Sequence, residues 1–194
     1  MSGDSGSAHA GARSTKFPDV WIDATRAASA WQVWGMSLVE RQVREASLKS
    51  SASISVWVTP DTAASVRRVR SDLQRLYSTP VDFLPVEGVE ELYKALERID
   101  APVVVVEGDV VYDDRILSHL ANVGADSVVT TEEGVAAVHL SPEGARRLVA
   151  ARQRDRAGAL ATAATAAAGV GQYDPQDLSA YVPSLRLTLT PFAV

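Results

Sequence analysis

Apolar residues along this chain follow two patterns, short β-branched runs and longer stretches with helical spacing. The clearest run, residues 103–106, is four consecutive valines, which is typical of a parallel strand covered on both faces. Similar runs predict strands at 19–23, 54–58, 81–84, 127–130, 135–140 and 185–189. Helical spacing predicts helices at 38–49, 61–77, 89–99, 113–123 and 142–154. The alanine-rich residues 157–168 are expected to form a helix or, in part, a linker.

Polar residues mark where several of these helices begin. Ser37 can cap the first helix, and Glu40 three residues later completes a capping box. Asp61 or Thr62 is expected to cap the second, and Pro142 fits the first position of a later helix. Asp113 and Asp114 are interpreted as capping residues placed favourably in the helix dipole.

The alternation of strands and helices predicts an α/β fold, a three-layer sandwich around a mostly parallel mixed sheet. A hairpin turn at 132–134 is expected to add an antiparallel strand. Residues 17–194 are expected to form one domain, because 194 residues suffice for a single sizeable core. The small, polar residues 1–16 predict a disordered leader.

Composition narrows the function classes. A net charge of −5 argues against a nucleic-acid partner, and the absence of cysteine excludes thiolate metal sites and fits a cytoplasmic location. No apolar run reaches the roughly 18–20 residues of a membrane span. His119 and His139 have no visible acid–base partner and are interpreted as structural, so no hydrolase is predicted.

Candidate chemistry centres on Asp109, which follows the valine strand at the edge where open α/β sheets bind ligands. Two interpretations stay open from the residues alone. Asp109 either closes the strand as a turn or capping aspartate, or it holds a metal ion or nucleotide.

The order of the elements resembles the nucleotidyltransferase family, in which a phosphorylated sugar or polyol is joined to a nucleoside triphosphate. The resemblance rests on WGMSLVERQVREA (34–46), similar to the family's G-x-P-L-x-x-R stretch, on VVVVEGDVVYDDRILSHL (103–120) and on AAVHLSPEGARRL (136–148). It implies a nucleotide-diphospho-sugar transferase-like fold. It further implies a nucleotide pocket lined by Asp23, Arg26, Gly35 and Asp109, with Asp109 holding Mg²⁺ in an active member.

A narrower resemblance is to the cytidylyltransferase-like domain that precedes CDP-alcohol phosphatidyltransferases. The terminal SLRLTLTPFAV is similar to the strand after which such chains continue. This resemblance implies a cytoplasmic domain at the cytosolic face of the membrane, serving phospholipid synthesis. Its expected partners are CTP or a CDP-linked ligand and a fused or associated membrane transferase.

The sequence departs from the active family in the phosphate loop. The stretch Asp23–Ala30 lacks both the glycines and the lysine of the family's triphosphate cradle, so Arg26 alone remains there. A second metal carboxylate has only Asp174 and Asp177 as candidates. We therefore expect a degenerate cytidylyltransferase-like domain. The alternatives are an active Mg²⁺-dependent cytidylyltransferase acting on a polyol phosphate such as inositol or glycerol phosphate, and a stand-alone interaction module.

Tryptophans occupy the altered loop. Trp31 and Trp34 fall where the phosphate cradle is missing, and each can bury on the order of 150–250 Å². We expect at least one of them to fill the vacated pocket or to pack into a partner surface, for example in a homodimer.

Overall fold

The computed structural model describes residues 17–49, 53–64, 66, 79–111, 114–122, 126–131, 134–154 and 171–173. Within them, seven strands form one sheet in the order β5-β4-β1-β6-β8-β7-β9. Strand β8 runs antiparallel to its neighbours β6 and β7, whereas the other neighbouring pairs are parallel. The strands are β1 (Asp19–Ala24), β4 (Ile54–Val58), β5 (Val81–Pro85), β6 (Val103–Glu107), β7 (Ser127–Thr131), β8 (Gly134–Leu140) and β9 (Gly171–Tyr173).

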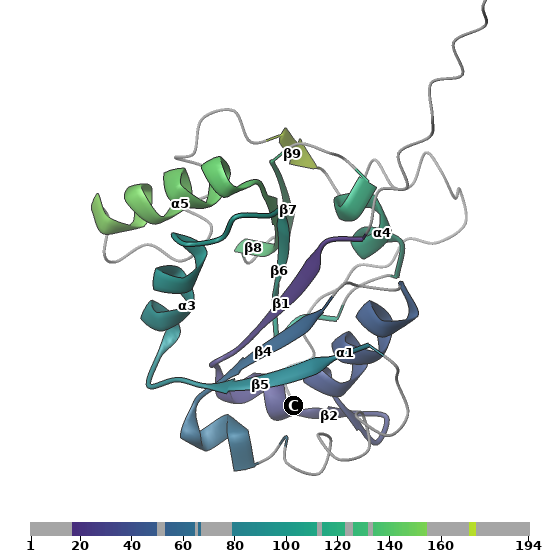
Figure 1. Cartoon of the computed structure of the whole chain (residues 1–194). Helices are drawn as coiled ribbons and strands as arrows, with labels where there is room; N and C mark the ends of the chain where they lie inside the picture. Colours follow the sequence, from purple (N-terminus) through teal and green to yellow (C-terminus); the bar gives the residue numbers. More distant parts are fainter. Residues whose placement is uncertain are drawn as a thin grey trace, which may run out of the picture.

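Helices cover both faces of this sheet, as Figure 1 shows. Helices α1 (Leu38–Leu48) and α4 (Asp114–Asn122) lie on one side, and α3 (Val89–Leu96) and α5 (Pro142–Arg154) on the other. The predicted three-layer α/β sandwich with a mostly parallel mixed sheet is confirmed.

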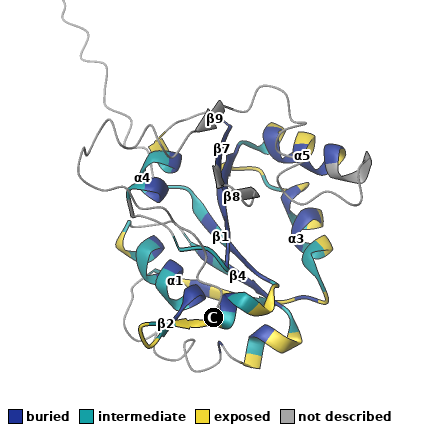
Figure 2. Cartoon of the chain, turned by 180° about the vertical axis from the view of Figure 1, so that it is seen from behind, coloured by how far each residue is buried: buried dark blue, intermediate teal, exposed yellow. Residues whose placement is uncertain are grey.

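Strand β6 lies at the centre of the sheet, between β1 and β8. Val104 and Val106 pack in the core layer beneath α1 and α4, whereas Val103 and Val105 pack in the layer beneath α3 and α5. All four valines are no more than 2% exposed, and Figure 2 shows the central strands in the colour of buried residues. The valine run is therefore a central strand buried on both faces, as predicted.

The start of α1 follows the prediction in the Ser37 cap but not in the second half of the capping box. The Ser37 hydroxyl accepts a hydrogen bond of 3.1 Å from the backbone amide of Glu40, which satisfies one otherwise unpaired amide of the first turn. The Glu40 carboxylate instead pairs with Arg44 one turn further on, at 2.7 Å. The inward face of α1 is Leu38, Val39, Gln42, Val43 and Ala46.

Other boundaries differ from the predicted ones. The helix expected to begin at Asp61 or Thr62 already includes Pro60, because proline fits the first helical position. The Thr62 hydroxyl accepts a hydrogen bond of 2.9 Å from the backbone amide of Thr59. The helix expected over 89–99 ends at Leu96.

The segment after β1 was expected to be a loop, but it contains structure of its own. A 3₁₀ turn, η1 (Ala27–Ala30), is followed by a two-stranded hairpin of β2 (Gln32–Val33) and β3 (Met36–Ser37). Strand β9 was likewise missed. Strands of two or three residues are too short to show a period in the sequence.

Several expectations fall outside the described residues. These are the leader 1–16, the helix 157–168, the strand 185–189, and the side chains of Asp113, Asp114, Asp174 and Asp177. Among the helices that the structure does describe, none combines the length and the apolar character needed to cross a membrane.

Candidate functional site

The candidate site lies where the carboxyl ends of β1 and β6 meet. The two strands are parallel neighbours, and their register places Asp23 beside Glu107. The backbone amide of Gly108 then donates a hydrogen bond of 2.8 Å to the Asp23 carbonyl oxygen. Because parallel strands end at the same edge of a sheet, residues about 85 positions apart in the sequence become neighbours here.

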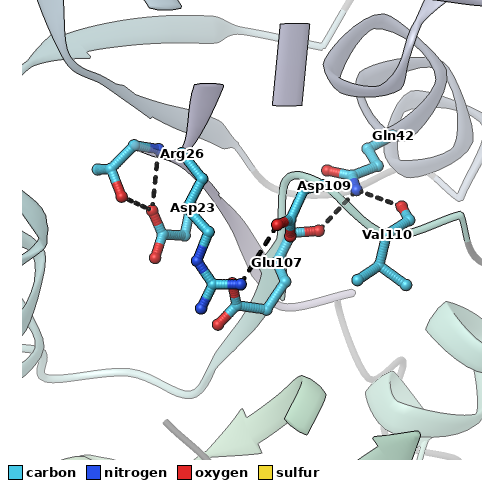
Figure 3. Close-up of polar contacts among 7 residues, drawn as sticks. Asp23, Arg26, Gln42, Glu107, Asp109 and Val110 are labelled. Atoms are coloured by element: carbon cyan, nitrogen blue, oxygen red, sulfur yellow. Dashed lines mark hydrogen bonds and ion pairs between the residues drawn. The ribbon is translucent and has the colours of Figure 1, made fainter. Parts of the chain in front are cut away.

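Arg26 contacts two acidic side chains at the carboxyl end of β6. Its guanidinium Nη1 lies 3.2 Å from Glu107 Oε2 and 3.2 Å from Asp109 Oδ2, as Figure 3 shows. The Glu107 and Asp109 side chains are 4% and 17% exposed, whereas that of Arg26 is 52% exposed. The arginine therefore covers the carboxylate pair from the solvent side.

The charge of Arg26 is secured by these neighbours. Partial burial by itself lowers the pKa of Arg26, but the charges of Glu107 and Asp109, the hydrogen bond to Asp109 and the charge of Asp23 raise it more. The pKa consequently lies above its ordinary value, and the guanidinium stays protonated wherever the protein is folded. The permanently protonated Arg26 guanidinium therefore neutralises part of the negative charge of Glu107 and Asp109.

Asp23 serves the turn that ends β1. Its Oδ1 accepts hydrogen bonds from the Thr25 backbone amide at 3.1 Å and from the Thr25 hydroxyl at 2.7 Å. An aspartate that bonds to the backbone amide two residues ahead stabilises a tight turn. This carboxylate oxygen is accordingly engaged within its own loop, at the entrance to η1.

The backbone after Arg26 closes on itself. The amides of Ser29 and Trp31 donate to the carbonyl oxygens of Arg26 and Ala28, at 3.0 and 2.9 Å. Within the described residues, positive φ angles occur at Trp34 and Gly35, beyond this turn. A phosphate cradle needs several amides that point at the ligand, and these two are used inside the 3₁₀ turn.

Two polar residues of the site were not predicted as functional. Gln42 of α1 is buried, and its Nε2 donates to the carbonyl oxygens of Glu107 at 2.7 Å and Val110 at 2.8 Å. Ser29 of η1 is fully buried, and its Oγ would lie 2.8 Å from a Cβ placed on Gly108. A glutamine on an otherwise apolar helix face was the signal that could have identified Gln42.

Three of the four predicted pocket residues, Asp23, Arg26 and Asp109, come together at this site. Gly35 takes no part in the contacts described above. It lies in the β2–β3 turn with a φ of 77°, and a Cβ added to it would have no atom within 4 Å. Its conformation, which suits glycine, explains its presence as a turn residue.

The first alternative for the loop tryptophans, that one of them fills the vacated pocket, is wrong, whereas packing into a partner surface stays a prediction. Trp31 is 54% exposed and Trp34 is 87% exposed, and the hairpin that follows Trp31 is largely exposed in Figure 2. The Trp34 ring instead faces Arg41, whose guanidinium carbon lies 5.5 Å from the ring centroid.

The residues present do not fit a Mg²⁺ site in this arrangement. The Arg26 guanidinium forms an ion pair with one oxygen of Glu107 and one oxygen of Asp109, and a cation would have to displace that group. Among the described residues, no group of three or more aspartate, glutamate or histidine side chains could hold a metal ion. The arrangement therefore supports no catalytic step through a metal ion while Arg26 stays in place.

Comparison with known proteins supports the fold. No family model and no curated protein matches the sequence. Among solved structures, the chain is similar to 4-diphosphocytidyl-2C-methyl-D-erythritol synthase from Anaerococcus prevotii (TM-score 0.63, 11% identity, covering 82% of this chain and 89% of the other).

Two further structures agree. One is the inositol-1-phosphate CTP transferase from T. maritima, with a TM-score of 0.53 and 8% identity over 82% of this chain and 86% of the other. The other is a UDP-glucose pyrophosphorylase complexed with UDP-glucose, with a TM-score of 0.54 and 9% identity over 77% and 85%. The chain therefore has a nucleotidyltransferase fold of the cytidylyltransferase-like type.

Proposed function

We propose that this chain is a degenerate cytidylyltransferase-like domain that has lost efficient nucleotidyl transfer and retains a role in ligand or partner binding. The observation that supports this best is the 3₁₀ turn after Arg26. It uses the amides of Ser29 and Trp31 internally, at the position where the active family is expected to cradle a triphosphate. The same segment, residues 24–34, contains no glycine and no lysine.

The physical consequence is a loss of transition-state stabilisation. Nucleotidyl transfer develops charge on the phosphate oxygens, and its catalysis depends on donors and cations already aimed at them. Removing one such donor typically lowers the rate by about 10²–10³-fold. A site without the cradle, without its lysine and with Arg26 bound to two carboxylates is expected to be slower still.

Pyrophosphate release tests this proposal. The purified chain would be incubated with CTP, Mg²⁺ and inositol phosphate or glycerol phosphate, with an active cytidylyltransferase as positive control. We expect no release above the rate without protein. Calorimetric titration with CTP and Mg²⁺ then shows whether nucleotide binding has survived the loss of catalysis.

One observation favours the second candidate, an active Mg²⁺-dependent cytidylyltransferase. Asp109 Oδ1 is a buried carboxylate oxygen without a hydrogen-bond partner, and it lies just beyond the carboxyl end of the central strand. In that case turnover with a polyol phosphate would be robust and would disappear in Asp109→Ala. This result would replace the first proposal with the second.

The cellular role we propose is that of a cytoplasmic accessory to a CDP-alcohol phosphatidyltransferase in phospholipid synthesis. Its support is the order of sequence elements described above and a fold shared with an enzyme whose name includes CTP transfer. The test is to add the purified domain to membranes that contain such a transferase and to measure phospholipid formation from a CDP-lipid. A change that saturates with domain concentration is expected, and an unchanged rate argues against the association.

A further inference from the structure

Glu107 and Asp109 at the end of β6 already have a cationic partner, the guanidinium of Arg26. Glu107 Oε2 and Asp109 Oδ2 contact the same nitrogen, Nη1 of Arg26, each at 3.2 Å. Two carboxylates that share one partner bring two negative charges close together. Such an arrangement requires positive charge nearby, because like charges in a partly buried site raise each other's energy.

Within the described part of the chain, three other oxygen atoms in this region lack a hydrogen-bond partner. Asp109 Oδ1, Gln42 Oε1 and Ser29 Oγ are all buried and all lack a hydrogen bond. Gln42 is 3% exposed and Ser29 is 0% exposed. Buried polar atoms are normally satisfied in folded proteins, so unsatisfied oxygens beside the loop favour a further donor or a cation in this region.

These oxygens border the same short loop as the acidic pair. The Gln42 amide lies beneath the loop, since its Nε2 bonds to the carbonyl oxygens of Glu107 and Val110. The Ser29 hydroxyl lies beside Gly108. Gly108 is the residue between Glu107 and Asp109 in the sequence. Carboxylate, amide and hydroxyl oxygens are the ligands that hard divalent cations such as Mg²⁺ and Mn²⁺ prefer.

We propose that Arg26 is an internal counter-ion that closes a latent divalent-cation site formed by Glu107 and Asp109. The guanidinium and a metal ion compete for the same two oxygens, so the native chain excludes the ion from this pair. Removing the guanidinium leaves two carboxylates without their counter-charge, and a divalent cation then binds in its place. This inference is compatible with the degenerate domain proposed above, whereas an active enzyme with Mg²⁺ on Asp109 would contradict it.

Manganese binding by the Arg26→Met variant tests the proposal. Methionine keeps an unbranched stem but removes the charge. Free Mn²⁺ would be measured by electron paramagnetic resonance in titrations of the full chain, without nucleotide. We expect Arg26→Met to bind one Mn²⁺ about tenfold or more tightly than the native chain, as fits the strength of a close charge interaction.

A matched control is Arg44→Met. Arg44 pairs with Glu40 at 2.7 Å within α1, so this variant makes the same chemical change at a different ion pair. It should bind Mn²⁺ no better than the native chain. In the double variant Arg26→Met/Asp109→Asn, the gained binding should be lost.

Three results would overturn the proposal. They are native Mn²⁺ binding as tight as that of Arg26→Met, a folded Arg26→Met that binds no Mn²⁺, and Mn²⁺ binding that persists in the double variant.

If Arg26→Met is unfolded without metal, its circular dichroism spectrum is measured during Mn²⁺ titration. The ion then has to restore the folded spectrum, and a failure to do so overturns the proposal as well. None of these outcomes depends on pyrophosphate release, so the proposed function is tested separately.

Discussion

The backbone amide of Gly108 is hydrogen-bonded to the carbonyl oxygen of Asp23 at 2.8 Å, which joins the ends of the two central strands. A side chain at Gly108 would break this approach. Its Cβ would lie 2.5 Å from that carbonyl oxygen and 3.0 Å from the Ala24 Cα, both of which are backbone atoms that side-chain rotation does not move.

Gly108→Ser is therefore expected to lower the free energy of unfolding by about 1–3 kcal/mol, the usual range for overpacking. Urea denaturation measures this. The matched control is Gly88→Ser, since a Cβ at Gly88 meets no atom within 4 Å and the residue caps α3. A serine there can cap the helix, so stability should be unchanged or slightly raised. Equal effects at the two glycines would contradict the packing argument.

Ser37→Ala removes the cap of α1. The Ser37 hydroxyl accepts the hydrogen bond from the Glu40 amide, and loss of such a cap typically lowers stability by about 0.5–2 kcal/mol. Ser47→Ala makes the same change in the same helix, but the Ser47 Oγ is buried without a hydrogen bond. Chemical denaturation should show Ser37→Ala destabilised and Ser47→Ala unchanged or more stable. The reverse order would show that the cap is not important.

Gln42→Leu tests how the loop after β6 is held. The substitution leaves the carbonyl oxygens of Glu107 and Val110 without the amide that donates to both, and unsatisfied buried acceptors typically cost about 1–3 kcal/mol. Asn122→Leu is the control, because its amide donates to the Ser118 carbonyl on the exposed end of α4. Hydrogen exchange of residues 107–110 should accelerate in Gln42→Leu and remain unchanged in Asn122→Leu.

Trp34→Asn is expected to leave stability unchanged or raise it by up to about 1 kcal/mol. Trp34 has a φ of 53°, and the left-handed region costs a bulky residue roughly 1–2 kcal/mol. The exposed cation–π contact between Trp34 and Arg41 stabilises the fold by only about 0.5–1 kcal/mol. Asparagine tolerates positive φ, and Asn-Gly favours this two-residue hairpin turn.

The contrast is Trp57→Ala. Trp57 is 7% exposed and its ring centroid lies 5.2 Å from that of Trp21, so a loss of about 3–5 kcal/mol is expected. Thermal and urea unfolding compare the two variants. A large loss in Trp34→Asn would mean that the hairpin tryptophan is buried, for instance against a second copy of the chain.

Local patterns were enough to predict most elements of the sheet and its covering helices. The valine run of β6 is apolar on both faces, and such a run stays buried wherever a central strand is placed. Ser37 and Glu40 form their cap within one turn of helix, so a few residues of sequence contain the whole interaction. The hairpin of β2 and β3 was missed because two-residue strands have no detectable period.

The sequence by itself also determined that Asp23, Arg26 and Asp109 lie at strand ends, since each follows directly from a strand pattern. Only the tertiary structure decided what they contact. Arg26 and Asp109 are 83 positions apart and Gln42 and Glu107 are 65 apart, and such pairs depend on the register of β1 against β6 and on the packing of α1. Register is a property of the whole sheet and its two core layers. Local spacing therefore located the charged residues, whereas the assembled sheet placed the guanidinium on the carboxylates.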